Sequence, residues 1–178
     1  MTARKMPRQH RWRSVQEVAT PPELLASVVD LVGAPIAWDL AANADNYVTA
    51  DARYLGPGSK RGADALAVQS HRLPGASGQL LWLNPPFGDI APWAAKCAAE
   101  AWLGASIAML APASVGADWF EAYVLGKAEV LALRPRITFV GHRDPYPKDC
   151  MIALYQPGAI VAPKRKFLTW RWKGDAAA

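Results

Sequence analysis

The sequence predicts a single-domain α/β fold in three layers, built on a mostly parallel sheet. The length of 178 residues suits one domain, and an apolar share of 52% is enough for a large core. Strand-like runs and helical patterns alternate along most of the chain, which is typical of a sheet covered by crossover helices. The last strand-like runs have no helix between them, so we expect an antiparallel hairpin at one edge.

The first helix and the first strand are predicted from the signals at their ends. Thr20-Pro21-Pro22-Glu23 has the pattern of a capping box with prolines in the first turn. Apolar residues at helical spacing then continue to a stop at Gly33. Residues 36–40 predict a buried strand that ends near one acid, Asp39. Residues 41–78 are expected to be mostly loop.

The second half of the chain predicts a further helix and several strands. Residues 80–83 form an apolar run typical of a buried strand. A helix is expected to begin at a cap on Asp89 and to place Trp93 and Trp102 in the core. The other predicted elements are strands at 105–110, 129–133, 137–140 and 151–155 and a short helix at 118–125.

Charge is distributed unevenly along the chain. The net charge of +5 arises from 20 Lys and Arg against 15 Asp and Glu. Residues 1–13 and 164–173 each hold five basic residues and no acid, whereas 14–163 carries 10 basic and 14 acidic residues, a net of −4. We therefore predict a body at 14–163 between basic tails at 1–13 and 164–178. Basic ends indicate a polyanionic partner, although tails that only aid solubility fit the charge equally well.

Several classes of protein are excluded by composition. The two cysteines form no disulfide framework and no metal-ligand spacing, and the three histidines are far apart, so we expect free thiols in a reducing cytosol and no metal site. Residues 101–117 are the longest uncharged stretch, which is too short and too interrupted to cross a bilayer. No secretory signal pattern follows the basic start. We expect no membrane association.

Asn84-Pro85-Pro86-Phe87, directly after an apolar strand, is the strongest chemical signal in the chain. Two prolines fix the backbone and remove two N–H donors, so the Pro85 carbonyl and the Asn84 amide oxygen can form a pair of acceptors. Such a pair suits an amino group with two hydrogens, and Phe87 offers a face on which a planar base can stack. Acceptors that polarise an exocyclic amine expose its lone pair to a methyl sulfonium. A simple strand stop is the alternative.

With other segments in the same order, this motif resembles the phage-encoded DNA adenine-N6 methyltransferases. The resembling segments are Thr20–Leu24, Trp38–Ala42, Asp64–Leu66, Leu81–Phe87, Leu110–Ala113, Asp118–Phe120 and Arg136–Phe139, which together span about 20–157. The resemblance implies a methyltransferase-like (Rossmann-like) sheet, S-adenosylmethionine as cofactor, and DNA of a phage or its host as partner. It also implies an enzyme of the bacterial cytoplasm, of the kind found in restriction-modification, that needs no metal.

The resemblance also implies roles for individual residues. The catalytic residues are Asn84, Pro85, Pro86 and Phe87, and the cofactor-binding residues are Thr20, Pro21, Asp39, Ala41, Asn43 and Asp64. The alternatives are Thr20 as a helix cap, Asp39 as a helix cap or a surface acid, Asn43 as a turn cap and Asp64 as an exposed loop acid. The chain departs from the family in two places: Phe87 replaces the usual Tyr, and alanines follow Asp39 where many methyltransferases have a glycine-rich turn.

Contacts with DNA are expected from the basic residues of the late loops and the C-terminal tail. The candidates are Arg136, Arg143, Lys148, Lys164, Arg165 and Lys166. Trp170 and Trp172 either stack on nucleic acid or dock on the body. No separate recognition domain is evident, so loops 54–78 and 141–149 are expected to give a short or relaxed sequence preference. The alternatives are methylation of cytosine N4, an RNA base or glutamine, and a non-catalytic binding module; the oligomeric state stays open.

Overall fold

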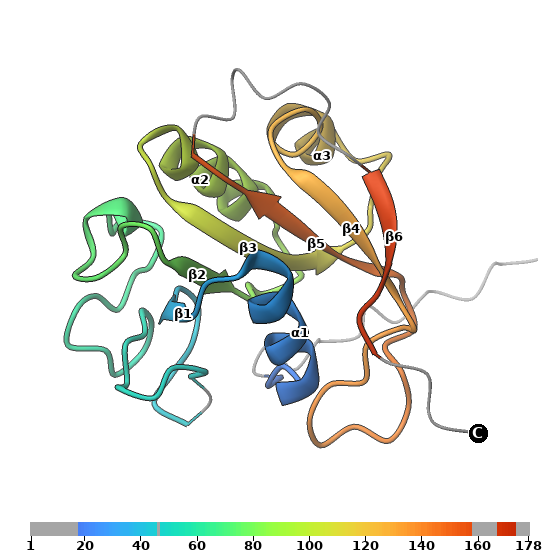
Figure 1. Ribbon diagram of the computed structural model, residues 1–178, viewed down its shortest axis with the longest axis horizontal. Helices are drawn as coiled ribbons and strands as arrows, with labels where there is room; N and C mark the ends of the chain where they lie inside the picture. The colour runs from blue at the N-terminus through green and yellow to red at the C-terminus, as the bar shows by residue number, and fades with distance from the viewer. Residues whose placement is uncertain (1–17, 46, 158–166, 174–178) are drawn as a thin grey trace, which may run out of the picture.

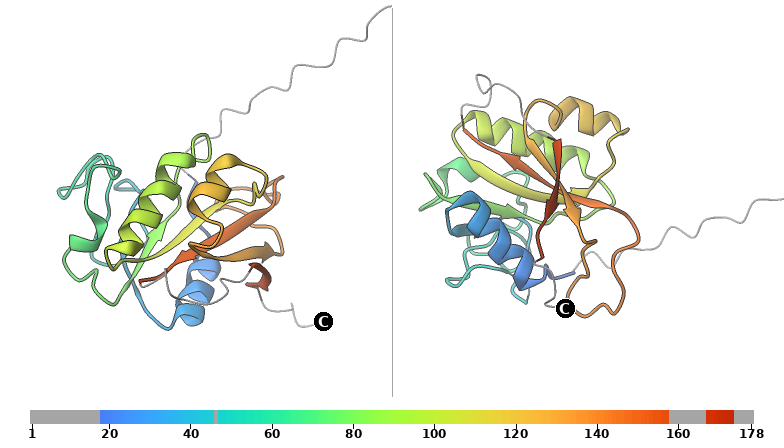
Figure 2. Two further views of the ribbon diagram at one scale, coloured as in Figure 1. Left: turned by 90° about the horizontal axis from the view of Figure 1, so that it is seen from above. Right: turned by 45° about the vertical axis from the view of Figure 1, so that its right-hand side comes forward.

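The computed structural model describes residues 18–45, 47–157 and 167–173, which form a sheet between two layers of helix (Figures 1 and 2). The helices are α1 (Pro22–Val32), the 3₁₀ helix η1 (Ser70–Arg72), α2 (Ala91–Trp102) and α3 (Asp118–Tyr123). The strands are β1 (Ile36–Asp39), β2 (Leu80–Leu83), β3 (Ser106–Pro112), β4 (Glu129–Arg134), β5 (Cys150–Tyr155) and β6 (Phe167–Arg171).

The strand order in the sheet is β1-β2-β3-β5-β4-β6. β1, β2 and β3 pair in parallel, β5 is antiparallel to both of its neighbours, and β6 is parallel to β4. Within the described sheet, every strand except β5 therefore points the same way. The predicted single-domain, three-layer, mostly parallel α/β fold is confirmed, and β4 and β5 supply its antiparallel pair. This pair does not lie at an edge as predicted, because β5 pairs with β3 and β6 covers β4.

Alternating strand residues build a core on each face of the sheet. On one face, Leu81 and Met109 pack with residues of α2 and α3, such as Cys97 and Phe120. On the other face, Trp82, Leu110 and Ile152 pack against Leu24 and Val28 of α1. Figure 2 shows α2 and α3 together on one side of the sheet and α1 on the other. The sheet is thus buried on both faces, as apolar parallel strands require.

Residues 137–140 were predicted as a strand, and this prediction is wrong. They run as a loop that leads away from β4, with Ile137 and Phe139 buried against the α1 face. The Ile137 carbonyl accepts a hydrogen bond from Tyr146 N at 2.7 Å, and Val140 N donates to the Ala19 carbonyl at 3.1 Å. These backbone groups bond to loops, so an apolar run alone did not distinguish a buried loop from a strand.

A strand is present where the sequence analysis predicts a basic C-terminal tail. Residues 167–171 form β6, which pairs with β4 from Val130 to Arg134. Beyond it, Trp172 is buried, its indole N–H donates to the Pro135 carbonyl at 2.7 Å, and its carbonyl accepts from Ser27 Oγ at 2.6 Å. Of the two alternatives for Trp172, the structure therefore favours docking on the body. Lys164, Arg165 and Lys166 lie outside the described residues.

The helix ends differ from the predicted caps. α1 begins after Pro21 and α2 after Ile90, and neither N-terminus has a side-chain cap, so the caps predicted from Thr20 and Asp89 do not form. Gly33 does end α1, with φ of 70° in the left-handed region. Trp102, expected in the core, is 64% exposed at the end of α2. Within the described residues, no helix has the length and apolar character needed to cross a membrane.

Candidate functional site

The candidate site lies where the carboxyl ends of β1, β2 and β3 meet. Asp39 is the last residue of β1 and is paired in register with Trp82 of β2, two residues before Asn84. β3 continues beyond the end of β2 to Pro112. The motif loop after β2 is therefore flanked by Asp39 on one side and by the end of β3 on the other, at the edge where open parallel sheets bind their ligands.

Asp39 is a buried carboxyl with no positive partner among the described residues. The residue is 3% exposed, and its side-chain oxygens accept hydrogen bonds from Ala41 N at 3.3 Å and Val48 N at 3.2 Å. None of the described Lys, Arg and His side chains forms an ion pair with it. Burial raises the pKa of Asp39 to about 7, although both backbone hydrogen bonds act in the opposite direction. A cation beside this carboxyl would relieve that cost.

The turn after β1 is narrow and is closed by a returning segment. Leu55 N donates to the Asp39 carbonyl at 2.8 Å, and Ala42 N donates to the Leu55 carbonyl at 3.0 Å. Gly56 has φ of 134°, and a Cβ added there would lie 1.9 Å from the Ala42 carbonyl oxygen. Glycine is thus required on the returning segment, because any side chain at position 56 would clash with the Ala42 backbone.

Asn84 bonds to the described residues through the nitrogen end of its amide. Nδ2 donates to the Val18 carbonyl at 3.1 Å and to Thr20 Oγ1 at 3.3 Å. Among the described residues, no hydrogen bond reaches Asn84 Oδ1 or the carbonyl of the buried Pro85. Both oxygens therefore have no hydrogen-bond donor among the described residues, and their role as acceptors for an amine stays a prediction.

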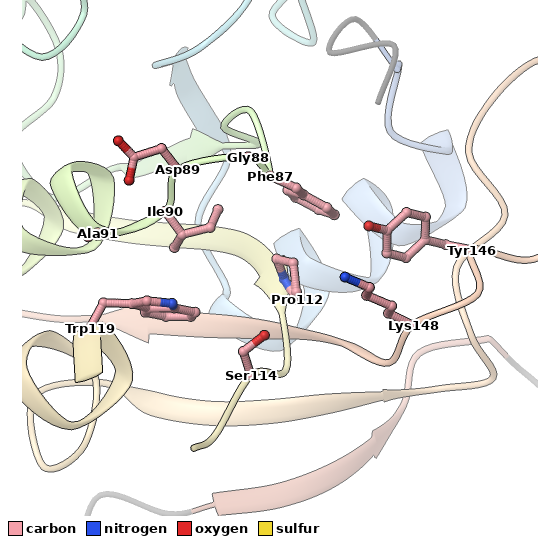
Figure 3. A pocket seen from close by; sticks show the side chains of 10 residues that line it. All are labelled: Phe87, Gly88, Asp89, Ile90, Ala91, Pro112, Ser114, Trp119, Tyr146 and Lys148. Carbon is pink, nitrogen blue, oxygen red and sulfur yellow. The ribbon is translucent and has the colours of Figure 1, made fainter. Parts of the chain in front are cut away.

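An aromatic cavity adjoins the motif on the side of β3. The Phe87 ring meets the Tyr146 ring edge-on, with centroids 5.6 Å apart, and both rings contact Phe139. Figure 3 shows the Tyr146 hydroxyl pointing toward Phe87 and the Lys148 amine directed between them and Pro112. The cavity measures about 210 Å³ and is lined by Phe87, Gly88, Asp89, Ile90, Ala91, Pro112, Ser114, Trp119, Tyr146 and Lys148. A planar group can enter it beside Phe87.

The other predicted cofactor residues are less close to this centre. Thr20 and Pro21 are buried beside the motif, because Thr20 contacts Asn84. The Asn43 side chain accepts from Asp45 N at 2.9 Å, in a turn four residues after Asp39. Asp64 is exposed and accepts from Leu66 N at 3.0 Å. Within the described part of the chain, no hydrogen bond joins Asp64 to Asp39 or Asn84, so its role stays a prediction.

The predicted DNA-contacting residues that are described lie at the same edge of the sheet. Arg136 follows β4, is exposed and pairs with Asp149 at 2.7 Å. Arg143 and Lys148 are exposed on the loop that connects β4 to β5. Because β5 runs opposite to β4, this loop stands at the carboxyl end of β4, beside the motif. Lys148 also lines the aromatic cavity.

Two contributors to the site were missed by the sequence analysis. Val18 lies before the first predicted helix. It accepts a hydrogen bond from Asn84 through its backbone carbonyl, which no side-chain pattern in the sequence reveals. Tyr146 is an aromatic residue between two prolines, Pro145 and Pro147, in a polar loop. Such a rigid aromatic in an exposed segment is a signal that could have identified it.

Comparison with known proteins gives one family. A family model described as DNA N-6-adenine-methyltransferase (Dam) matches residues 10–149. That range contains β1 to β4, the motif and the loop that carries Tyr146. Neither the curated proteins nor the solved structures give a match. Among the described residues, no cluster of three or more His, Cys, Asp and Glu side chains could hold a metal ion.

Proposed function

Because the chain belongs to the DNA N-6-adenine-methyltransferase (Dam) family, we propose that it transfers a methyl group from S-adenosylmethionine to the N6 amine of adenine in phage or host DNA. The observation that supports this most is the pair of available acceptors, Asn84 Oδ1 and the Pro85 carbonyl, beside an aromatic cavity. The family match supports the general reaction, and the two acceptors support our proposal that it takes place at the motif.

S-adenosylmethionine would be held at the carboxyl end of β1. The buried Asp39 carboxyl has no cationic partner in the described chain and fits the positive charges of that cofactor. Ala41, Asn43, Thr20 and Pro21 lie on the segments around it. Asp64 completes the proposed set. When bound, the cofactor supplies an electrophilic methyl group on its sulfonium.

The target adenine would enter the aromatic cavity, on the other side of the motif from Asp39. Its ring stacks beside Phe87, with Tyr146 as a second wall, after the base has left the DNA helix. Asn84 Oδ1 and the Pro85 carbonyl then accept the two hydrogens of the N6 amine. This contact draws electron density onto the nitrogen and directs its lone pair toward the donor side, which is electrostatic and orientational catalysis.

The role of Asn84 is tested by Asn84→Ala. Removal of one of the two acceptors should lower kcat about 10²-fold, within the range for loss of one preorganised hydrogen-bonding group. The affinity for S-adenosylmethionine, measured by calorimetry, should change little. Gln156→Ala is the matched control, because Gln156 is an exposed amide at the end of β5, at the opposite edge of the sheet. Near-normal turnover of the Asn84 variant would contradict the proposal.

The methylated base is identified by digestion of product DNA to nucleosides and measurement of their masses. We expect N6-methyldeoxyadenosine and no modified cytosine. Methylation-sensitive sequencing of the same DNA then tests the proposed short or relaxed preference. Substitutions in loops 54–78 and 141–149 should change the preferred sequence without changing the modified atom. Methylation of cytosine N4, or of RNA in place of DNA, would refute this part of the proposal.

A further inference from the structure

Residues 18–20, which are separated from α1 only by Pro21, contact both loops of the candidate site. Val18 and Thr20 each accept a hydrogen bond from Asn84 Nδ2, at 3.1 and 3.3 Å. Between them, the Ala19 carbonyl accepts from Val140 N, at 3.1 Å, on the loop that connects β4 to β5. We call residues 18–20 the strap. Figure 2 shows the start of α1 beside that loop, so the strap lies between the motif and the loop that carries Tyr146.

The orientation of an asparagine amide is not fixed by its shape. Its NH₂ and oxygen ends are nearly equal in size, and a half-turn about the last side-chain bond exchanges a donor for an acceptor. The Val18 carbonyl can only accept, so it selects the nitrogen end of Asn84. Thr20 Oγ1 takes the second hydrogen of the same nitrogen. With both hydrogens used, the oxygen is left on the side away from the strap.

We propose that the strap sets the polarity of the catalytic amide, with Thr20 as a positioning residue that acts through Asn84. The reversed amide would offer two N–H donors to an amine that also donates, and the amine would be repelled. The inference rests on the proposed function, since it names what holds one of the proposed acceptors in place. The hydroxyl hydrogen of Thr20 is not used in its contact with Asn84, so the same residue can also donate to the cofactor.

The test compares Thr20→Val, which keeps the shape and removes the acceptor, with Thr20→Ser, which keeps the acceptor. Thr20→Val should lower kcat about three- to tenfold, the scale of one neutral hydrogen bond, and Thr20→Ser should recover most of that loss. Ser27→Ala is the control: Ser27 lies on α1 and also bonds to a distant segment, at Trp172, but not to Asn84. Its kcat should equal that of the wild type. Thermal unfolding confirms that each variant is folded.

Two measurements separate positioning from a structural effect. In an Asn84→Ala background, Thr20→Val should cause no further loss of single-turnover rate. In the ¹⁵N-labelled protein without cofactor or DNA, the Asn84 side-chain amide hydrogens should exchange slowly in the wild type and faster in Thr20→Val. An equal loss of rate in both backgrounds, or unchanged exchange, would overturn the proposal. The exchange experiment needs no activity, so it decides on the strap even if the methylated base proves not to be adenine.

Discussion

At the scale of single residues, Asp39 is the group whose ionisation should govern cofactor binding. Burial raises its pKa to about 7, so near neutral pH much of the free protein carries a protonated carboxyl. A cationic ligand favours the ionised form, so binding must release that proton. We expect affinity for S-adenosylmethionine to fall by up to about tenfold per pH unit below 7. Calorimetry between pH 5.5 and 7.5, in buffers of different ionisation enthalpy, measures both the affinity and the number of protons released. An affinity that does not depend on pH, with no proton release, would show that Asp39 does not contact the positive charge of the cofactor.

The Asp39 carboxyl should also lower the free energy of unfolding of the cofactor-free protein as the pH rises. An unfolded Asp39 ionises near 3.8, whereas the folded one retains its proton up to about 7, so the folded state binds more protons between these values. The free energy of unfolding therefore falls across that window, by an amount on the order of 1–4 kcal/mol. Asp39→Asn should flatten this decline, which urea unfolding at pH 5 and pH 8 would measure. An unchanged pH profile in the variant would contradict the raised pKa of the buried Asp39 carboxyl.

The sequence analysis could assign candidate roles to residues whose chemistry depends on residue type alone. It could not do so for residues whose role depends on contacts that form on folding. The acceptor pair of Asn84 and Pro85 follows from residue type and rigidity alone. For Thr20 the sequence leaves a cap and a cofactor residue as alternatives, because its capping-box pattern is local, whereas its partner Asn84 is 64 residues away. Tyr146 was missed for the same reason: its contacts to Phe87 and Phe139 form only after folding.

At the scale of elements, a buried ionic cluster fastens the long loop before β2 to α2. Glu100 of α2 accepts hydrogen bonds from Ser70 N at 3.0 Å, from His71 N at 2.9 Å and from the Lys96 amine at 3.0 Å. The His71 ring lies 2.6 Å from the same carboxylate, and Lys96 also donates to the Val68 carbonyl. A lysine on a helix is usually solvated, but the Lys96 side chain is only 10% exposed. The cluster holds η1 in place at one end of the loop.

Glu100→Gln should therefore destabilise the protein and loosen this loop. Burial favours the neutral acid, but hydrogen bonds from His71, Lys96 and Ser70 outweigh it and hold the pKa of Glu100 below its usual value. Its stabilising effect is therefore present above pH 4.5 and is lost as the pH falls through the lowered pKa. Breaking a buried pair costs about 3–5 kcal/mol, measurable by urea unfolding and by tryptic cleavage at Arg72.

The exposed Glu121 of α3 provides the control for that variant, since Glu121→Gln should change stability by less than about 0.5 kcal/mol. Equal stability of the two variants would show that the Glu100 cluster contributes little. At this scale the sequence predicted the alternation of β1, β2, α2 and β3 well, because each element has its own period and end signals. It did not predict β6, since residues 167–171 are largely exposed and become a strand only by pairing with β4.

At the scale of the whole molecule, positive charge gathers at the carboxyl edge of the sheet. Residues 134–149 and 171–173, which begin at the last residues of β4 and β6, hold six Lys and Arg against two Asp. The motif, the aromatic cavity and Asp39 lie at the same edge of the sheet. A DNA backbone that crosses this edge would meet the cations and bring a base to Phe87, although the body at 14–163 carries a net charge of −4, the balance of 10 basic and 14 acidic residues.

The salt dependence of DNA binding tests this arrangement. Arg143→Gln with Lys148→Gln should reduce the slope of log affinity against log salt by about 0.9 for each phosphate that these two side chains no longer neutralise. Lys127→Gln is the control, because Lys127 is an exposed lysine in the turn before β4, at the opposite edge of the sheet, and should leave the slope unchanged.

The basic ends are tested by deletion of residues 1–11 and replacement of Lys164, Arg165 and Lys166 by Gln. Substitution is needed there because truncation from 164 would remove β6 and Trp172 and so disturb the sheet itself. If the ends contact phosphates, the slope should become shallower while cofactor affinity holds; equal slopes in folded proteins would leave the ends a role in solubility alone.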